Sequence, residues 1–293
     1  MGKWTAADIG EQHGRTFVVT GANSGLGAVV ARELATMGAR VVLACRDTAK
    51  GEAVAQDIGP NAEVRKLDLA DLGSVRAFAD SIEQVDVLIN NAGVMAVPFR
   101  RTVDGFEMQI GTNHLGHFAL TGLLIDRVTD RVVTMSSAAH AIGTLNLEDL
   151  NWEDRRYSRW RAYGQSKLAN LLFTYELQRR FTAAGSPLKA LAAHPGYSST
   201  NLQSHTESFL DSVMAIGNRI IGQRAEIGAL PELYAATDPT VQGGSYLGPD
   251  GPLEVRGYPK RVGSSKKSKN LDDARRLWEL SEKLTGVTYP FGG

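Results

Sequence analysis

The sequence predicts a single doubly wound α/β domain, in which helices cover both faces of a mainly parallel, seven-stranded sheet. Two observations lead to this fold class. Short apolar runs rich in β-branched residues alternate with longer segments of helical periodicity through most of the 293 residues. No internal repeat and no Pro/Gly-rich linker divides the chain, so we expect one domain spanning residues 1–293.

The predicted strands are almost continuously apolar, as expected for strands that are buried on both faces. They cover residues 15–20, 40–45, 63–68, 85–90, 131–136, 188–194 and 243–248. Helical periodicity predicts helices at residues 25–37, 48–57, 71–83, 104–129, 161–184, 208–222, 224–237 and 271–284. Residues 263–293 are expected to form a polar C-terminal loop followed by the last helix. Ligands of such sheets bind beyond the carboxyl ends of the strands, so functional motifs should follow strands.

Composition excludes several classes of protein. The chain carries 32 basic and 32 acidic residues, so no overall charge attracts it to nucleic acid or to an anionic membrane. Cys45 is the only cysteine, which excludes an internal disulfide and a multi-cysteine metal cluster and fits a reducing compartment. No apolar run approaches the about 18 residues that a membrane-spanning helix needs. We therefore expect a cytoplasmic protein without a membrane span, a metal ion or a nucleic-acid partner.

The stretch "TGANSGLG" at 20–27 follows the first predicted strand and opens the first helix. Gly21 would permit a tight turn, Gly25 would let the backbone approach a pyrophosphate, and Gly27 would let the helix pack closely on the strand. The free N–H groups at the helix N-terminus would then face the phosphates. The motif predicts a dinucleotide site of the Rossmann type.

The end of the second strand indicates which nucleotide is bound. An acid at this position holds the ribose hydroxyls of NAD, whereas a base suits the 2′-phosphate of NADP. Here the strand ends in Cys45 and Arg46, so we expect NADP in preference to NAD. Asp68, in "LDL", would accept a hydrogen bond from the adenine amino group, and "NNAG" at 90–93 would lie along the adenosine.

Two tyrosines have a cation four residues later, a spacing that places both side chains on one face of a helix. Tyr157 precedes Arg161, and Tyr163 precedes Lys167. A free phenol has a pKa of about 10, so an adjacent ammonium would have to lower the pKa before the phenol could act as a base at neutral pH. Tyr163 begins an apolar helix that would hold it rigidly, whereas Tyr157 lies in a charged stretch. We therefore expect Tyr163 to be the acid/base and Ser137 to hold the substrate oxygen.

The chain resembles the short-chain dehydrogenase/reductase family. The resemblance rests on "TGANSGLG", "NNAG", "NHLGHF" (113–118), "SS" (136–137), "YGQSK" (163–167) and "HPG" (194–196), in this order and at suitable spacing. Within the family it is similar to the retinol-dehydrogenase-like branch.

The resemblance implies a catalytic tetrad of Asn113, Ser137, Tyr163 and Lys167, with Ser136 as an open alternative to Ser137. Lys167 would lower the pKa of Tyr163 and hold the nicotinamide ribose, and Asn113 would support a water that relays protons. The predicted cofactor-binding residues are Gly21, Asn23, Ser24, Gly25, Leu26, Gly27, Arg46, Asp68, Leu69, Asn91, Ala92, Gly93, Tyr163, Lys167, Pro195, Gly196, Ser198 and Thr200.

Two segments distinguish this chain from the common pattern of the family. The interval between Ser137 and Tyr163 is longer than usual, and we expect it to form a flap over a neighbouring helix or the substrate, with His140 in a local hydrogen bond. Segment 201–238 is predicted to be a substrate lid. Its apolar positions could line a pocket, although packing on the core is the favoured interpretation. If they line the pocket, the substrate is a lipophilic alcohol or its aldehyde or ketone.

The sequence leaves three functions in competition. The first is an NADP-dependent alcohol dehydrogenase or carbonyl reductase, the second a C=C reductase using the same Tyr–Lys pair, and the third an NADP(H)-binding regulator without turnover. The resemblance also implies a homodimer or homotetramer that pairs through the 161–184 helix. Its apolar stripe could instead face its own sheet, and it consists of Leu168, Leu171, Leu172 and Tyr175.

Overall fold

The computed structural model describes residues 3–196 and 225–291 of the chain. Its strands are β1 (Thr16–Thr20), β2 (Arg40–Cys45), β3 (Ala62–Lys66), β4 (Val85–Asn90), β5 (Val128–Met135), β6 (Lys189–Ala193), β7 (Tyr246–Pro249) and β8 (Pro259–Arg261). Its α-helices are α1 (Gly25–Thr36), α2 (Thr48–Ile58), α3 (Leu72–Asp80), α4 (Met108–Ile110), α5 (Gly116–Leu124), α6 (Arg159–Ala183), α8 (Ala225–Thr237) and α9 (Leu271–Thr285).

All eight strands form one sheet in the order β3-β2-β1-β4-β5-β6-β7-β8. Strands β1 to β7 pair in parallel, and only β8 runs antiparallel, against β7. The chain order reverses between β1 and β4, which is the position where doubly wound folds bind their ligands. The predicted single α/β domain with a mostly parallel sheet is therefore confirmed.

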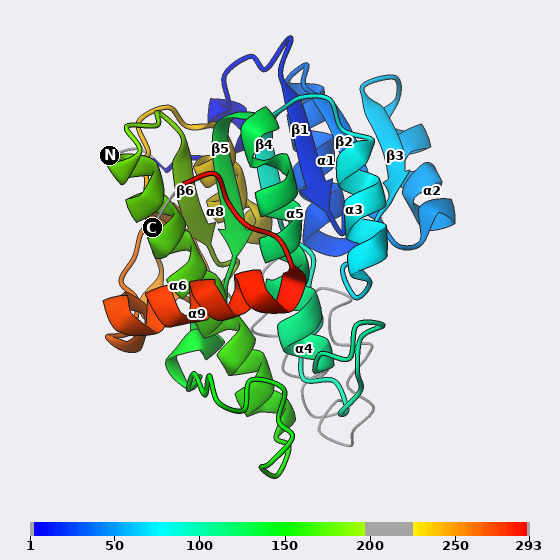
Figure 1. The fold of residues 1–293 in the computed structure, drawn as a ribbon. Helices are drawn as coiled ribbons and strands as arrows, with labels where there is room; N and C mark the ends of the chain where they lie inside the picture. Colours follow the sequence, from blue (N-terminus) through cyan, green and yellow to red (C-terminus); the bar gives the residue numbers. More distant parts are fainter. Residues whose placement is uncertain (1–2, 197–224, 292–293) are drawn as a thin grey trace.

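Helices cover both faces of the sheet, and each face has its own apolar core (Figure 1). Helices α1 and α8 pack together over one face, around Leu34 and Leu233. Helices α3, α5 and α6 cover the other face, around Phe118 and Leu177. Because both faces are buried, the strands read as apolar runs, which is the pattern that predicted them.

Polar caps fix where several helices begin. Asp47 caps α2 by accepting a hydrogen bond from Lys50 N at 3.1 Å, and Asp71 caps α3 through Gly73 N at 2.8 Å. Such caps satisfy backbone N–H groups that have no partner within the helix.

Two predicted elements differ from the structure. The sheet has eight strands rather than the predicted seven. The additional strand is β8, a short, half-polar strand at the sheet edge, and its sequence contains no apolar run that would predict it. The predicted helix 104–129 is divided into α4, a π-helical segment at Gly111–Leu115, α5 and a 3₁₀ turn, and β5 begins at Val128. The π-helical segment carries Asn113, consistent with the tendency of such segments to occur at functional sites.

The C-terminal helix α9 lies across α6 (Figure 1). Leu168 and Leu172 of the apolar stripe pack with Leu277 of α9, and Leu171 packs with Tyr246 of β7. The three leucines of the stripe are therefore buried within their own chain, and Leu171 faces the sheet as the alternative expected, whereas Tyr175 is half-buried.

The predicted lid, 201–238, is only partly described. Helix α8 packs against α1 and against strands β5, β6 and β7, so this part of the segment belongs to the core. Residues 201–224, including the predicted helix 208–222, lie outside the described residues.

Across residues 3–196 and 225–291, no helix is both long and apolar enough to cross a membrane. Nor does any group of three or more His, Cys, Asp and Glu side chains come together there to hold a metal ion.

Candidate active site

Two glycines of the phosphate loop stand where a larger residue would not fit. Gly21 has a φ of +68°, in the left-handed region that favours glycine. A Cβ atom on Gly27 would lie 2.5 Å from Asn91 Nδ2 and 2.6 Å from Gly21 O. The N-cap residue of α1, Ser24, makes no side-chain capping bond, so the helix N-terminus keeps N–H groups for an anion. The loop has the features of a dinucleotide cradle.

Arg46 lies exposed directly after β2, without a hydrogen-bond or ion-pair partner in the part of the chain that the structure describes. The neighbouring acid, Asp47, caps α2 and forms an ion pair with Lys50 Nζ at 3.3 Å. The carboxylate is thus committed to the helix, whereas the guanidinium is open to a ligand. Cys45 is buried, and burial raises the pKa of its thiol to about 11, which makes it unreactive at neutral pH.

The "NNAG" turn after β4 connects the phosphate loop to the predicted reaction centre. Asn91 Nδ2 donates to Thr20 O at 2.7 Å, and Ala92 N donates to Thr20 Oγ1 at 2.9 Å. A Cβ atom on Gly93 would lie 3.5 Å from Lys167 Nζ. Farther along the sheet edge, Asp68 Oδ1 accepts from Ala70 N at 3.0 Å, so this carboxylate also stabilises its own turn.

Asn113 is held rigidly in the π-helical segment. Its Oδ1 accepts from Val94 N at 2.8 Å, and its Nδ2 donates to Val94 O and to Ser166 Oγ, each at 2.9 Å. Ser166 Oγ in turn donates to Tyr163 O at 2.8 Å. Three protein groups therefore fix the orientation of the Asn113 side-chain amide.

The two serines of "SS" have different roles in the structure. Ser136 is buried, and its hydroxyl donates to Lys167 O at 2.8 Å. Ser137 is half-buried, and its Oγ accepts from Ala139 N at 3.2 Å. The Ser137 side chain also acts to lower the pKa of Tyr163, the predicted acid/base.

We therefore expect Ser137→Ala to lower kcat by roughly 100-fold, the typical effect of losing one donor to a reacting oxygen. Ser136→Ala should cost about 1 kcal/mol of unfolding free energy, from its lost hydrogen bond, and change kcat less than about tenfold. Steady-state kinetics and thermal unfolding of both variants test this split. Equal losses of kcat would contradict it.

Tyr163 and Lys167 lie one turn apart on α6, and both are almost fully buried. Lys167 Nζ lies 5.7 Å from the centre of the Tyr163 ring and donates to Met135 O at 3.1 Å. Burial raises the pKa of Tyr163 to about 12, although the Ser137 side chain opposes this, and burial lowers the pKa of Lys167 to about 8. The residues around Tyr163 therefore do not provide the lowered phenol pKa that the sequence predicted, because burial outweighs them.

Glu232 on α8 is an acid that the sequence analysis missed. It is 0% exposed, and neither carboxylate oxygen has a hydrogen-bond partner among the described residues. Burial raises the pKa of Glu232 to about 8, and the charge of Lys167 opposes this rise. Conversely, the charge of Glu232 raises the pKa of Lys167, which opposes the effect of burial. A lone acid inside the apolar run "IGALPELYAA" was the available signal.

We expect Glu232→Gln to shift the alkaline limb of the pH profile of kcat/KM to lower pH. Without the carboxylate, the pKa of Lys167 falls further below its ordinary value, so the ammonium is lost at a lower pH. Glu226→Gln, at an exposed acid on the same helix, is the matched control. A profile identical to that of the unmodified protein would show that Glu232 does not act on Lys167.

His117 is a second group that the sequence analysis missed. Its Nδ1 donates to Asn113 O at 3.0 Å, and its Nε2 lies 2.9 Å from Thr20 Oγ1. Burial lowers the pKa of His117 to about 4, so the ring is neutral at pH 7. It connects the strand that leads into the phosphate loop with the helix that carries Asn113. The spacing of four residues in "NHLGH" was the available signal.

The "HPG" turn follows β6 and packs against the loop after β7. Gly196 has a φ of +69°, and a Cβ atom there would lie 2.4 Å from Val255 O. His194 Nε2 lies 3.1 Å from Glu254 Oε2. Two further residues of the predicted cofactor set, Ser198 and Thr200, lie outside the described residues.

The long interval between Ser137 and Tyr163 packs mainly on its own protein. Leu150 packs with Leu168 and Leu172 of α6, so the apolar face of this flap covers a neighbouring helix. His140 makes the expected local hydrogen bond, with Nδ1 donating to Ser137 O at 2.7 Å.

Tyr157 is more firmly held than the sequence suggested. Its hydroxyl donates to Glu107 Oε1 and accepts from Gln109 Nε2, both at 2.8 Å. Burial and the Glu107 charge raise the pKa of Tyr157. These contacts make Tyr157 an anchor of the flap, committed to buried protein groups.

The chain is similar in sequence and in fold to known proteins. A family model described as short chain dehydrogenase matches residues 15–210. The chain is 42% identical to retinol dehydrogenase 13 of Homo sapiens, over 94% of this chain and 86% of that protein. A crystal structure of an uncharacterized protein from Mycobacterium Paratuberculosis is 58% identical, with a TM-score of 0.87, and covers 99% of this chain and 100% of that one. A further similar structure comes from Beutenbergia cavernae and is named as an NAD(P)-dependent gluconate 5-dehydrogenase with NADP bound at low occupancy. It is 27% identical, with a TM-score of 0.63, and covers 80% of this chain and 95% of that chain.

Proposed function

Since this chain belongs to the short-chain dehydrogenase family, we propose that it interconverts a lipophilic alcohol and its aldehyde or ketone with NADP, and that Tyr163 is the general acid/base. The family and its retinol dehydrogenase relatives make the protein an oxidoreductase of the alcohol dehydrogenase and carbonyl reductase type. Beyond this reaction type, we propose the preferred cofactor, the substrate class and the roles of individual residues.

The arrangement of side chains on and around α6 supports the proposed residue roles. Helix α6 brings Tyr163 and Lys167 together, the Ser137 side chain acts on the pKa of Tyr163, and the Gly93 turn adjoins Lys167 Nζ. The predicted acid/base, its cation and the predicted cofactor turn are thus neighbours.

The residues present fit a nicotinamide dinucleotide. The glycine cradle at Gly21 and Gly27 and the N-terminus of α1 suit its pyrophosphate, and Lys167 suits a ribose hydroxyl. The guanidinium of Arg46, which has no partner among the described residues and lies beside an acid already engaged as a helix cap, supports NADP over NAD. The NADP in the Beutenbergia cavernae structure is consistent with this preference.

When bound, the nicotinamide supplies or accepts the hydride at the substrate carbon. Ser137 would donate a hydrogen bond to the substrate oxygen, and the Tyr163 hydroxyl would give that oxygen its proton in reduction. With a pKa of about 12, Tyr163 keeps its proton at neutral pH, which suits it to be the acid in carbonyl reduction. In alcohol oxidation Tyr163 would take the proton back, and the Lys167 ammonium would stabilise the phenolate.

Apolar surface beside Tyr163 supports a lipophilic substrate. Trp160 is 38% exposed and stands edge-on to the Tyr163 ring, with ring centres 6.2 Å apart. Ile142, which follows the Ser137 turn, is 58% exposed. The retinol dehydrogenase name of the 42% identical relative is consistent with a substrate of this class.

We also propose that the protein is cytoplasmic and that it forms a homodimer or homotetramer. The reduced, buried Cys45 is consistent with the location. Subunit pairing would need a surface other than the leucines of the apolar stripe, because α9 and β7 already cover them.

We expect purified protein to bind NADPH more tightly than NADH and to reduce apolar aldehydes or ketones faster than small polar ones. Fluorescence titration of both cofactors, followed by turnover of a graded set of aliphatic, aromatic, retinoid and steroid carbonyls, checks this. Tighter binding of NADH, or the highest kcat/KM with small polar carbonyls, would contradict the proposed cofactor or substrate class.

A further inference from the structure

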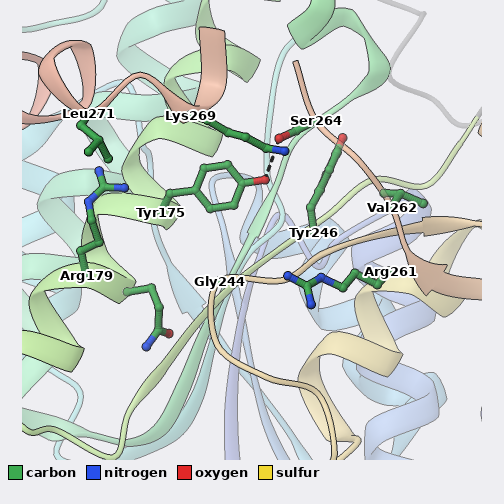
Figure 2. A pocket seen from close by; sticks show the side chains of 10 residues that line it. Tyr175, Arg179, Gly244, Tyr246, Arg261, Val262, Ser264, Lys269 and Leu271 are labelled. Carbon is green, nitrogen blue, oxygen red and sulfur yellow. Dashed lines mark hydrogen bonds between the residues drawn. The ribbon is translucent and has the colours of Figure 1, made fainter. Parts of the chain in front are cut away.

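A pocket of about 400 Å³ opens between α6, the β7–β8 edge of the sheet and the C-terminal loop, residues 262–270 (Figure 2). Tyr175 and Arg179 come from α6, Arg261 comes from β8, and Ser264 and Lys269 come from the loop. Its volume falls within the range of small-molecule sites. It shares no lining residue with the predicted tetrad or the predicted cofactor site.

The wall of this pocket carries an excess of positive charge. Within the described part of the chain, Arg261 and Lys269 have no ion-pair partner, and no acidic side chain lines the pocket. Arg179 shares the carboxylate of Glu176 with Arg180, so this group adds one more net positive charge beside the pocket. Two unpaired cations at one pocket match an occupant with about two negative charges, as a phosphate monoester carries at neutral pH.

The pocket also offers neutral donors and an apolar wall. Tyr175 Oη and Ser264 Oγ lie 2.9 Å apart, in a pocket that Lys269 also lines (Figure 2). Cations and hydroxyls together suit the three oxygens of a phosphate group. Leu271, which is 62% exposed, and Val262 provide apolar surface for an organic group attached to the phosphate.

A hydrogen-bonded path leads from the pocket to the predicted tetrad. His140 Nε2 accepts from Ser265 N of the C-terminal loop at 3.1 Å, and His140 Nδ1 donates to Ser137 O at 2.7 Å. The His140 ring also stands edge-on to Tyr246, which lines the pocket, with ring centres 5.7 Å apart. One imidazole thus joins the loop that carries Ser264 and Lys269 to the backbone of Ser137.

We propose that this pocket binds a small organic phosphate monoester, and that its occupancy changes turnover at the tetrad through the Ser265–His140–Ser137 contacts. Binding would fix the C-terminal loop by drawing Lys269 and Ser264 onto the phosphate. The position of Ser137 then depends on the occupant, because the loop and Ser137 share His140. A monoanionic carboxylate would satisfy only one of the two unpaired cations and should bind more weakly.

Calorimetric titration with phenyl phosphate, at constant ionic strength and with the protein saturated by NADP⁺, tests the binding. Benzoate and inorganic phosphate serve as probes that lack one negative charge or the organic group. The test variant is Arg261→Gln/Lys269→Gln, and Lys266→Gln, at an exposed lysine of the same loop, is the matched control. Comparing the two variants assigns the heat to the pocket whether or not NADP⁺ occupies the proposed cofactor site.

We expect saturable binding of phenyl phosphate that is at least roughly tenfold weaker in the double variant, from the loss of charge-assisted hydrogen bonds, and unchanged in Lys266→Gln. Phenyl phosphate should change kcat or KM in the unmodified protein and in Lys266→Gln, but not in the double variant. Absence of saturable binding, equal binding by the double variant, tighter binding of benzoate, or binding that leaves turnover unchanged would each overturn the proposal.

Discussion

Replacing Tyr163 with phenylalanine is expected to lower kcat by about 10³-fold or more, while the Kd for NADPH stays within about twofold. The change removes only the hydroxyl that would transfer the proton, and the ring keeps its packing on the buried face of α6. Steady-state turnover of an apolar aldehyde and fluorescence titration of NADPH measure the two quantities.

Tyr157→Phe is the matched control for this variant. The Tyr157 hydroxyl binds Glu107 and Gln109 rather than any residue of the predicted tetrad, so kcat should change little. Glu107 is 0% exposed and would lose a partner, so the free energy of unfolding should fall by about 1–3 kcal/mol. Substantial turnover by Tyr163→Phe, or a larger loss of kcat in Tyr157→Phe, would refute the assignment of Tyr163.

Replacing Arg46 with glutamine should raise the Kd for NADPH by roughly 10–100-fold and leave the Kd for NADH within about twofold. Hydrogen bonds to a charged group contribute about 1.5–3 kcal/mol each, and only NADPH carries the 2′-phosphate that Arg46 would bind. Arg46 has no partner in the described part of the chain, so its loss should not unfold the protein.

Lys50→Gln removes an exposed cation that already pairs with Asp47, and it controls for general charge effects near the site. Its effect on NADPH binding should be much smaller than that of Arg46→Gln. If both variants weakened NADPH equally, or if Arg46→Gln weakened NADH as much as NADPH, the 2′-phosphate would not be the group that Arg46 recognises.

Much of the fold could be predicted because it depends on burial. Strand β2 occupies Arg40–Cys45, the predicted range, since both of its faces are covered and its residues therefore read as a continuous apolar run. Strand β8 was missed because three residues at the edge of a sheet need no apolar pattern. The long helix predicted at 104–129 contains a π-helical segment at Gly111–Leu115, and periodicity alone does not distinguish such a segment from an α-helix.

The candidate site was predictable where one helix or one loop sets the geometry. The spacing of Tyr163 and Lys167 fixes them on one face of α6, and the glycines of the phosphate loop follow from the turn they must make. Sequence reasoning missed interactions between distant segments, such as the charge interaction of Glu232 with Lys167 and the contact of His117 with Thr20. These depend on how α8 and the helix carrying His117 pack on the sheet.

Sequence also could not give the pKa of Tyr163. The favourable effect of a nearby cation was visible in the spacing, but the opposing cost of burying the phenol was not.

The most direct test of the central claim is transfer of deuterium from NADPH labelled at the nicotinamide C4 hydride position to an α,β-unsaturated, apolar aldehyde. Mass spectrometry of the product locates the label. We predict deuterium on the carbon that bears the new hydroxyl group, with the C=C bond intact. Deuterium on the β-carbon of a saturated aldehyde would indicate a C=C reductase, and tightly bound NADPH that transfers no deuterium to any carbonyl tested would indicate a protein that only binds the cofactor.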